Sequence, residues 1–466
     1  MNLLCGLIAV VISTAACLKF LPRKVLLPTL TFILAYGATT VVGASLLLDP
    51  FGQTQFQYFM GTDAVQYMAT LGGASYWSLL LMPLVLAPIG SIVGYKLSQP
   101  MISSAADSFV TLRLWLPSAA LLLIFLTAYC IYKLWLADAL VPLSAVDPKI
   151  CIEDKIQRRA ALITLLGNSV YKVLYAAVPI LVALTLTHAL QQKKRSSLAL
   201  CGLSILLGVW LCLALYMKAP ILIILIGAAA AAIAAGVSSV VVLPATIAAG
   251  AIIFSALSVT QVCATPNITP TIYHLPKGSK NPADAIAIKI EPLGENAQAY
   301  QKVVYFAVQI ARAPIFRMAA GFPYYVDTFS DPGERCGIWA PHVFPSRCFP
   351  PIKAYEIAYP FKPNATTGYL PAPVNTSALA EAGYAYSVAA TLLVGFIIGV
   401  ISTFGGYKTP FSVAFAVATC IFAYYASQVS LTASLIDSYG LLWLVLTIVA
   451  AWIISFLAQW KRSEPF

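Results

Sequence analysis

The chain has 466 residues, of which 60% are hydrophobic and 10% are charged, and its mean hydropathy is +0.85. A soluble globular protein carries about 25% charged residues. This composition therefore excludes a water-soluble domain and requires a lipid bilayer around most of the chain. The net charge of +11 does not indicate nucleic-acid binding, because the bases stand singly or in small groups between apolar stretches, as in oriented membrane proteins.

Eleven apolar stretches have the length of a membrane-spanning helix. They lie at residues 1–20, 25–48, 75–95, 114–137, 169–190, 198–217, 219–236, 238–258, 385–404, 409–426 and 438–459. Residues 219–258 are too long for one helix, and Gly236-Val237-Ser238-Ser239 offers a break. Two short helices or one helix with a re-entrant piece both fit this stretch. The sequence predicts an all-α polytopic membrane protein with a bundle of about eleven transmembrane helices.

The distribution of charged residues orients these helices. With the N-terminus outside, the inner loops and helix ends hold eleven basic and two acidic residues, and all other segments hold 17 basic and 15 acidic residues. This asymmetry predicts outer loops at residues 49–74, 138–168 and 259–384. The predicted domains are residues 1–258 with eight helices, the large extracytoplasmic loop 259–384, and residues 385–466 with three helices and a cytoplasmic tail.

The large loop differs from the others in composition. It holds 16 of the 30 prolines, 17 aromatic residues and two of the three histidines. Proline opposes long helices, whereas aromatic residues oppose disorder. We expect an ordered but irregular cap, with one helix from Asn296 to Arg312. A disulfide between Cys336 and Cys348 fits an oxidising compartment, and two free thiols fit the same spacing.

Several basic residues lie in the predicted outer segments, where the positive-inside rule disfavours them. They are Arg158, Arg159, Lys218, Arg312 and Arg317. A diphosphate-linked lipid headgroup would explain them, because Arg and Lys bind phosphate through charge-assisted hydrogen bonds. Pairing with loop acids such as Glu153 and Asp154 is the alternative.

Aromatic and acidic residues gather in the segment from Gly321 to Phe329, which contains Tyr324, Tyr325 and Asp327. Rings stack on apolar sugar faces, and a carboxylate binds hydroxyls or accepts a proton. The segment therefore predicts a sugar site, with ordinary packing of the cap as the alternative. His342 could act as a base near neutral pH, although a lone histidine is more often structural. No metal-binding motif, P-loop or acid in the middle of a span points to a metal, a cofactor or a carboxylate relay.

Three stretches of the sequence carry a resemblance to a known family. The first is Tyr216-Met-Lys218-Ala-Pro, between two apolar runs before the large loop. The second is the Arg-containing stretch from Arg312 to Tyr325. The third runs from Thr366-Thr-Gly368 through Glu381-Ala-Gly383 into the glycine-containing helix that holds Val394 and Gly399. In these features and in its architecture the chain resembles the bacterial O-antigen polymerases (Wzy-type oligosaccharide repeat-unit polymerases), which are related to the O-antigen ligases.

The resemblance implies a metal-independent, cofactor-free, inverting glycosyltransferase of the bacterial inner membrane. Its donor would be a glycan on polyprenyl (undecaprenyl) diphosphate, and a new lipid-linked repeat unit would supply the acceptor hydroxyl for lipopolysaccharide synthesis. A chain-length regulator protein would be a further partner. For catalysis we select Arg312, Arg317, Asp327 and His342, and for substrate binding Arg158, Arg159, Lys218, Tyr324, Tyr325 and Glu381. Glu381 is also a candidate for the base, beside Asp327 and His342.

Other functions stay open on the sequence alone. An O-antigen ligase, or another lipid-linked glycosyltransferase, needs the same cations and cap but a different acceptor. A lipid-linked oligosaccharide flippase or other transporter would need a polar path through the bundle and internal repeats, which the sequence does not display. A structural scaffold is a further alternative, although a large ordered loop then lacks a purpose.

Overall fold

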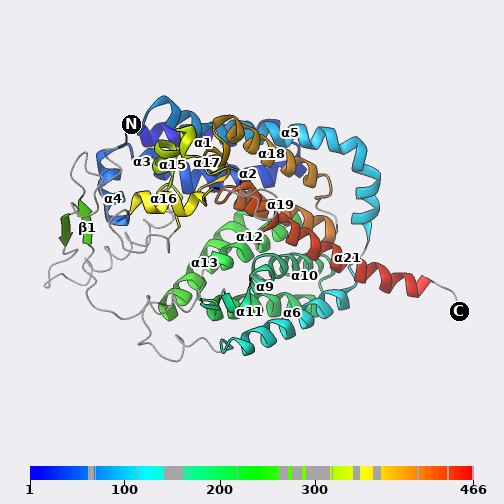
Figure 1. Cartoon of the computed structure of the whole chain (residues 1–466). Coiled ribbons are helices and arrows are strands. Elements are labelled where there is room, and N and C mark those ends of the chain that lie inside the picture. The colour runs from blue at the N-terminus through cyan, green and yellow to red at the C-terminus, as the bar shows by residue number, and fades with distance from the viewer. Residues whose placement is uncertain are drawn as a thin grey trace. The chain divides into compact units, whose positions relative to one another are not determined.

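The computed structural model is built almost entirely of helices (Figure 1). It describes residues 1–60, 68, 70–112, 114–140, 161–162, 164–167, 169–217, 219–261, 271–274, 286–289, 315–316, 318–338, 347–359, 369–406, 409–437 and 440–463. The chain divides into two compact units. Unit 1 comprises Met1–Gly94, Asn267–Ile397 and Ala423–Thr432, and unit 2 comprises Tyr95–Pro266, Ile398–Phe422 and Ala433–Phe466.

Unit 1 contains the N-terminal helices and the described parts of the segment 259–384. Its elements are α1 (Asn2–Phe20), α2 (Arg23–Tyr36), the π-helical turn η1 (Gly37–Val41), α3 (Val42–Leu46), α4 (Pro50–Met60), the first part of α5 (Ala74–Thr111), β1 (Thr271–His274), β2 (Ile286–Lys289), α15 (Phe322–Phe329), η5 (Pro332–Glu334), α16 (Pro350–Ala358), α17 (Val374–Ala382) and most of α18 (Tyr384–Ser402). The two strands form an antiparallel pair with Thr271 opposite Lys289. This short sheet is a small exception to the predicted all-α fold.

Two buried tyrosines join α2 and α3 to α5. The hydroxyl of Tyr36 donates to the carbonyl of Leu80 at 3.0 Å, and the hydroxyl of Tyr76 donates to the carbonyl of Ala44 at 2.8 Å. Both side chains are fully buried, so each hydroxyl needs such an acceptor. These bonds fix the position of α5 along its axis relative to α2 and α3.

Small residues allow α5 and α18 to approach closely. A Cβ placed on Gly90 or Gly94 of α5 would overlap backbone oxygens of α18, and one placed on Gly395 of α18 would overlap α5 in return. Helices in a bilayer gain little from the hydrophobic effect and associate through such close packing. The glycines therefore allow the close contact between α5 and the middle of α18.

Unit 2 is a bundle with α10 near its centre. Its elements are the rest of α5, α6 (Leu116–Leu136), α9 (Ser169–Lys172), the π-helical turn η3 (Val173–Ala177), α10 (Val178–Gln192), α11 (Arg195–Ala214), α12 (Ala219–Ala234), α13 (Ser239–Gln261), the end of α18, most of α19 (Pro410–Ala426), most of α20 (Leu431–Ile436) and α21 (Leu441–Ser463). Gly236, with φ +95°, separates α12 from α13. Residues 219–258 therefore form two helices with a break at Gly236. Whether both cross the membrane stays a prediction.

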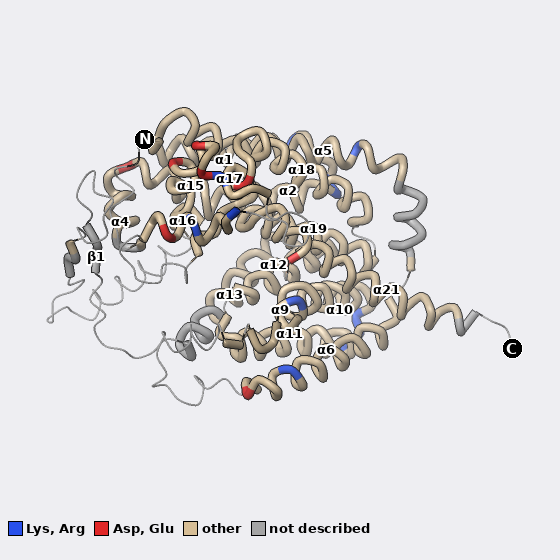
Figure 2. Tube along the Cα trace, viewed as in Figure 1, with Lys and Arg blue, Asp and Glu red and all other residues tan. Residues whose placement is uncertain are grey.

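In the part of the chain that the structure describes, eight helical segments are long and apolar enough to cross a membrane. They are Asn2–Phe20, Arg23–Leu46, Ala74–Met101, Leu116–Leu136, Ser169–Gln192, Arg195–Ala214, Tyr384–Ser402 and Leu431–Trp460. The other three predicted spans coincide with shorter apolar helices, Ala219–Ala234, Ser239–Ile253 and Pro410–Ala426. The chain is thus a multi-pass helical membrane protein by length and composition, and the count of eleven stays a prediction. In Figure 2 most of the coloured acidic residues lie around α15, α16 and α17, with others such as the one at the end of α6, and the long helices carry few charges.

The described parts of the segment 259–384 contain regular structure. Its described parts include three helices, and proline stands at the start of each one: Pro323 in α15, Pro350 in α16 and Pro373 before α17. Proline is favoured in the first turn because its missing N–H needs no partner there. At these three positions proline marks the start of a helix. The helix predicted from Asn296 to Arg312 lies outside the described residues.

Candidate active site

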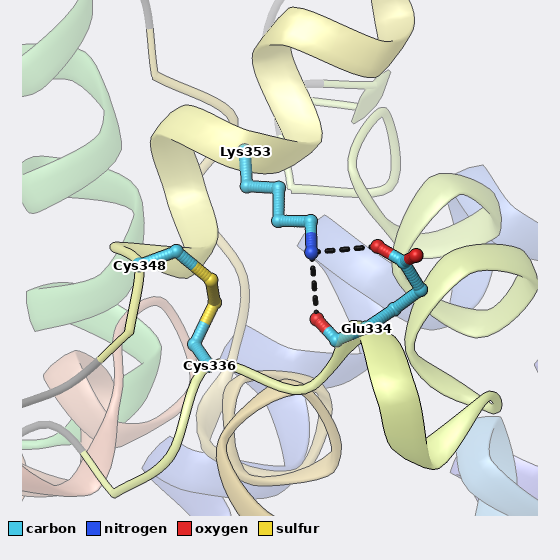
Figure 3. The surroundings of a disulfide bond; sticks show 4 residues. All are labelled: Glu334, Cys336, Cys348 and Lys353. Atoms are coloured by element: carbon cyan, nitrogen blue, oxygen red, sulfur yellow. Dashed lines mark hydrogen bonds and ion pairs between the residues drawn. A yellow bond between two sulfur atoms is a disulfide. The ribbon is translucent and has the colours of Figure 1, made fainter.

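A disulfide organises the described part of the segment between α15 and α16. Cys336 and Cys348 are bonded, which confirms the predicted pair, and their Cα atoms lie 4.8 Å apart. Beside the disulfide the Lys353 ammonium lies 2.7 Å from the Glu334 carboxylate and donates to the Glu334 carbonyl at 2.8 Å (Figure 3). The backbone N–H of Arg347 donates to the carbonyl of Cys336 at 2.7 Å. These contacts hold the residues around η5 against the start of α16.

The segment around Cys336 also packs against the last turn of α17. The backbone N–H of Cys336 donates to the carbonyl of Ala380, and that of Gly337 donates to the carbonyl of Glu381, both at 2.9 Å. The last carbonyls of a helix have no partner within the helix. The two bonds therefore satisfy the end of α17 and fix Glu381 relative to the disulfide.

Arg335 fills the break between α17 and α18. The break is at Gly383, whose φ of +94° favours glycine, and a Cβ there would lie 2.6 Å from the guanidinium carbon of Arg335. The guanidinium donates to the carbonyls of Phe329 and Ser330, both at 3.3 Å. Among the described residues these bonds occupy two of its five N–H donors, and no carboxylate pairs with it. Arg335 can therefore still bind an anion.

Glu381 is a buried carboxyl in the last turn of α17, two residues before Gly383. Its side chain is 3% exposed, and burial raises its pKa from 4.5 to about 8. No hydrogen bond reaches this carboxyl from the part of the chain that the structure describes. The neighbouring Tyr325 hydroxyl donates to the carbonyl of Leu370 at 3.1 Å, and its own pKa is raised by burial and by the charge of Glu381. Glu381 can take up or release a proton near neutral pH.

The predicted aromatic residues of α15 lie in the core of unit 1. Tyr324 is 1% and Tyr325 0% exposed, and the ring of Tyr325 lies 5.3 Å from that of Phe329. Their burial favours the alternative of ordinary packing, and sugar stacking stays a prediction. The half-buried Asp327 accepts a hydrogen bond from the hydroxyl of Thr70 at 3.0 Å, which ties α15 to the chain before α5.

The structure brings together only some of the predicted site residues. Tyr325 and Glu381 are neighbours, whereas the carboxylate of Asp327, on the same helix as Tyr325, is bound to Thr70. Six predicted residues lie outside the described part of the chain and stay predictions. They are Arg158, Arg159, Lys218, Arg312, Arg317 and His342.

Arg335 is not among the site residues predicted from the sequence. The predicted basic residues lie near the ends of predicted spans and in the stretch from Arg312 to Tyr325, and not beside the cysteines. A usable signal was present, because Arg335 and Arg347 each directly precede one of the half-cystines. A disulfide between those cysteines holds the backbone beside each arginine in place.

Among the described residues no group of three or more His, Cys, Asp or Glu side chains is placed to hold a metal ion. No protein-family model, curated protein or solved structure matches the chain. A functional assignment must therefore depend on the sequence and on the chemistry of Glu381 and Arg335.

Proposed function

We propose that the chain is an inner-membrane glycosyltransferase that polymerises polyprenyl-diphosphate-linked oligosaccharide repeat units, as the resemblance to O-antigen polymerases implies. The observation that carries the proposal is the buried carboxyl of Glu381 in the last turn of α17. The half-buried Arg335 lies against Gly383, two residues further along the chain. A carboxyl with a pKa of about 8 suits a general base near neutral pH.

The reaction needs both groups. The acceptor hydroxyl oxygen forms a bond to the anomeric carbon and passes its proton to Glu381. The bond from that carbon to the diphosphate oxygen breaks, and the negative charge on the leaving diphosphate grows. Arg335 stabilises this charge with its remaining N–H donors, together with the predicted cations Arg312 and Arg317.

The disulfide supports an extracytoplasmic site. Disulfides persist in oxidising compartments and are rare in the cytosol, and the bond between Cys336 and Cys348 holds the residues that dock onto Glu381. This agrees with the orientation predicted from the basic residues. We therefore place the large loop outside the inner membrane, where a lipid-linked repeat unit and a chain-length regulator would reach it.

A defined assay tests the proposal. Purified full-length protein is incubated with lipid-linked repeat units, and the products are separated by chain length. Glu381→Gln and Arg335→Gln are each expected to reduce polymer formation by about 10²-fold or more, because they remove the base or a charge-stabilising donor.

Glu356→Gln on α16 is the matched control, since it changes a half-buried glutamate of the same unit and is expected to keep the ladder. Normal ladders from both site variants would contradict the proposed site. Transfer onto lipid A without polymer would indicate a ligase instead, and movement of the substrate across vesicles without transfer would indicate a flippase.

A further inference from the structure

The N-terminus of α17 is buried inside unit 1. Its first three residues, Val374, Asn375 and Thr376, are each 0% exposed. The backbone N–H groups in the first turn of a helix have no acceptor within the helix, and the N-cap residue Pro373 provides no side-chain acceptor. In the described part of the chain, no other group accepts a hydrogen bond from these three N–H groups. The start of α17 therefore holds three buried donors that need an acceptor.

Two buried oxygens at the same helix end need a partner as well. They are Oδ1 of Asn375 and Oγ1 of Thr376, which have no hydrogen-bond partner among the described residues. The amide of Asn375 has a fixed orientation, because its Nδ2 donates to the carbonyl of Leu79 at 2.9 Å and to the hydroxyl of Tyr36 at 3.2 Å. A reversed amide would place Oδ1 against the Leu79 carbonyl, which is also an acceptor. Oδ1 therefore points away from both bonds and stays available.

These donors and acceptors lie at one end of a helix within the membrane-spanning part of unit 1. Tyr36 and Leu79 belong to the segments Arg23–Leu46 and Ala74–Met101, which can cross a membrane. Polar backbone groups inside a bilayer need a partner from the protein or from bound water. The Cα–Cβ bonds of a helix tilt toward its N-terminus, so the side chains of Asn375 and Thr376 lean toward the free N–H groups.

The mixture of donors and acceptors selects the kind of ligand. An anion would suit the N–H groups at the positive end of the helix dipole, but the amide oxygen of Asn375 would repel it. A cation would suit the two side-chain oxygens, but the N–H groups would repel it. A neutral molecule that both donates and accepts hydrogen bonds suits all of these groups, and water is the smallest such molecule.

We infer that the start of α17 binds an ordered water molecule in place of a capping side chain. The water accepts a hydrogen bond from a first-turn N–H and donates one to Oδ1 of Asn375, and the hydroxyl of Thr376 is its third partner. A buried water typically makes about three hydrogen bonds. Through Asn375 it connects the start of α17 to Tyr36 of α2 and Leu79 of α5. This inference does not depend on the proposed glycosyltransferase activity.

Electron cryo-microscopy of the full chain in lipid nanodiscs, at a resolution that shows ordered water, tests the inference directly. A compact density is expected at hydrogen-bond distance, roughly 2.7–3.2 Å, from Oδ1 of Asn375 and from a first-turn N–H of α17. The inference is overturned if a map that shows ordered water elsewhere in the chain has no density at this place. An elongated density would also overturn it, because it would indicate a larger ligand.

A substitution gives a second test, because the two possibilities predict opposite signs. Thr376→Val keeps the shape of the side chain and removes its hydroxyl. If the hydroxyl binds water, the variant loses a hydrogen bond, and its melting temperature in detergent is expected to fall by about 2–4 °C. If the hydroxyl has no partner, its removal from a buried position leaves the melting temperature unchanged or raises it.

Thr391→Val on α18 is the matched control. Thr391 is also 0% exposed, but its hydroxyl donates to the carbonyl of Ser387 in the same helix at 2.7 Å. Such a bond within a helix contributes little to stability, so the control is expected to melt close to the wild type. The inference is overturned if Thr376→Val does not melt at a lower temperature than Thr391→Val.

Discussion

Glu381 offers a test that needs no substrate, because its burial links the stability of the protein to pH. The carboxyl has a pKa of about 8 in the folded chain and an ordinary value of 4.5. Between these values the folded state binds more protons than the unfolded state, so stability falls as pH rises. From this shift, ionising Glu381 in its 3%-exposed position costs up to about 5 kcal/mol above pH 8.

Glu381→Gln keeps the shape of the side chain and removes the ionisation. The stability of the variant relative to the wild type is therefore expected to increase from about pH 5 to about pH 8 and then to level off. Thermal unfolding in detergent, followed by the fluorescence of the eight tryptophans, measures this difference. Glu356→Gln serves again as the control and is expected to follow the wild type.

Parallel melting curves for the wild type and Glu381→Gln across this pH range would refute the reasoning, since they would mean that Glu381 is not desolvated. The pH dependence of the transfer rate provides a second test. If Glu381 is the base, the rate of transfer by the wild type rises as pH approaches 8. If the stability difference is found but the rate does not rise toward pH 8, then Glu381 is buried as described but is not the catalytic base.

Three further predictions concern the framework of the site. Replacing both half-cystines by Ala is expected to lower stability by about 2–3 kcal/mol, measured by thermal unfolding, and equal melting with and without the disulfide would contradict this. Gly383→Ala is expected to cost about 1–3 kcal/mol, because of its positive φ and the adjacent Arg335. Gly202→Ala, with open space around it, should cost nothing. Gly90→Leu should separate α5 from α18 and lower the yield of folded protein on size-exclusion chromatography, and an unchanged profile would argue against the close packing.

Hydropathy predicted the helices well because a bilayer imposes length and composition on each span. The break near Gly236 was also readable, since a glycine after an apolar run often ends a helix. The cysteine pair could be proposed from composition and compartment. In each case the physical constraint acts on a short piece of chain, so a local pattern is sufficient.

The candidate site could be predicted only in part, because it depends on contacts between distant residues. Glu381 was selected from its sequence context, but its burial depends on how α17 packs against α15. Arg335 became a candidate only because it lies against Gly383, which is 48 positions later in the sequence. The prolines are ambiguous in the sequence for a related reason, since the same residue type starts a helix or interrupts one according to its position.

The different burial of α10 and α1 has a consequence for mutational tolerance. In an 18-residue window of the segment Ser169–Gln192, which ends with α10, 83% of the residues are buried inside the protein, whereas in such a window of α1 the share is 17%. Substitutions in α10 must therefore conserve side-chain volume, but most positions of α1 need only stay apolar. A saturation mutagenesis library should tolerate exchanges among Leu, Ile, Val and Phe throughout α1 and reject many of them in α10. Homologous chains could thus drift apart along their lipid-facing helices while retaining one interior.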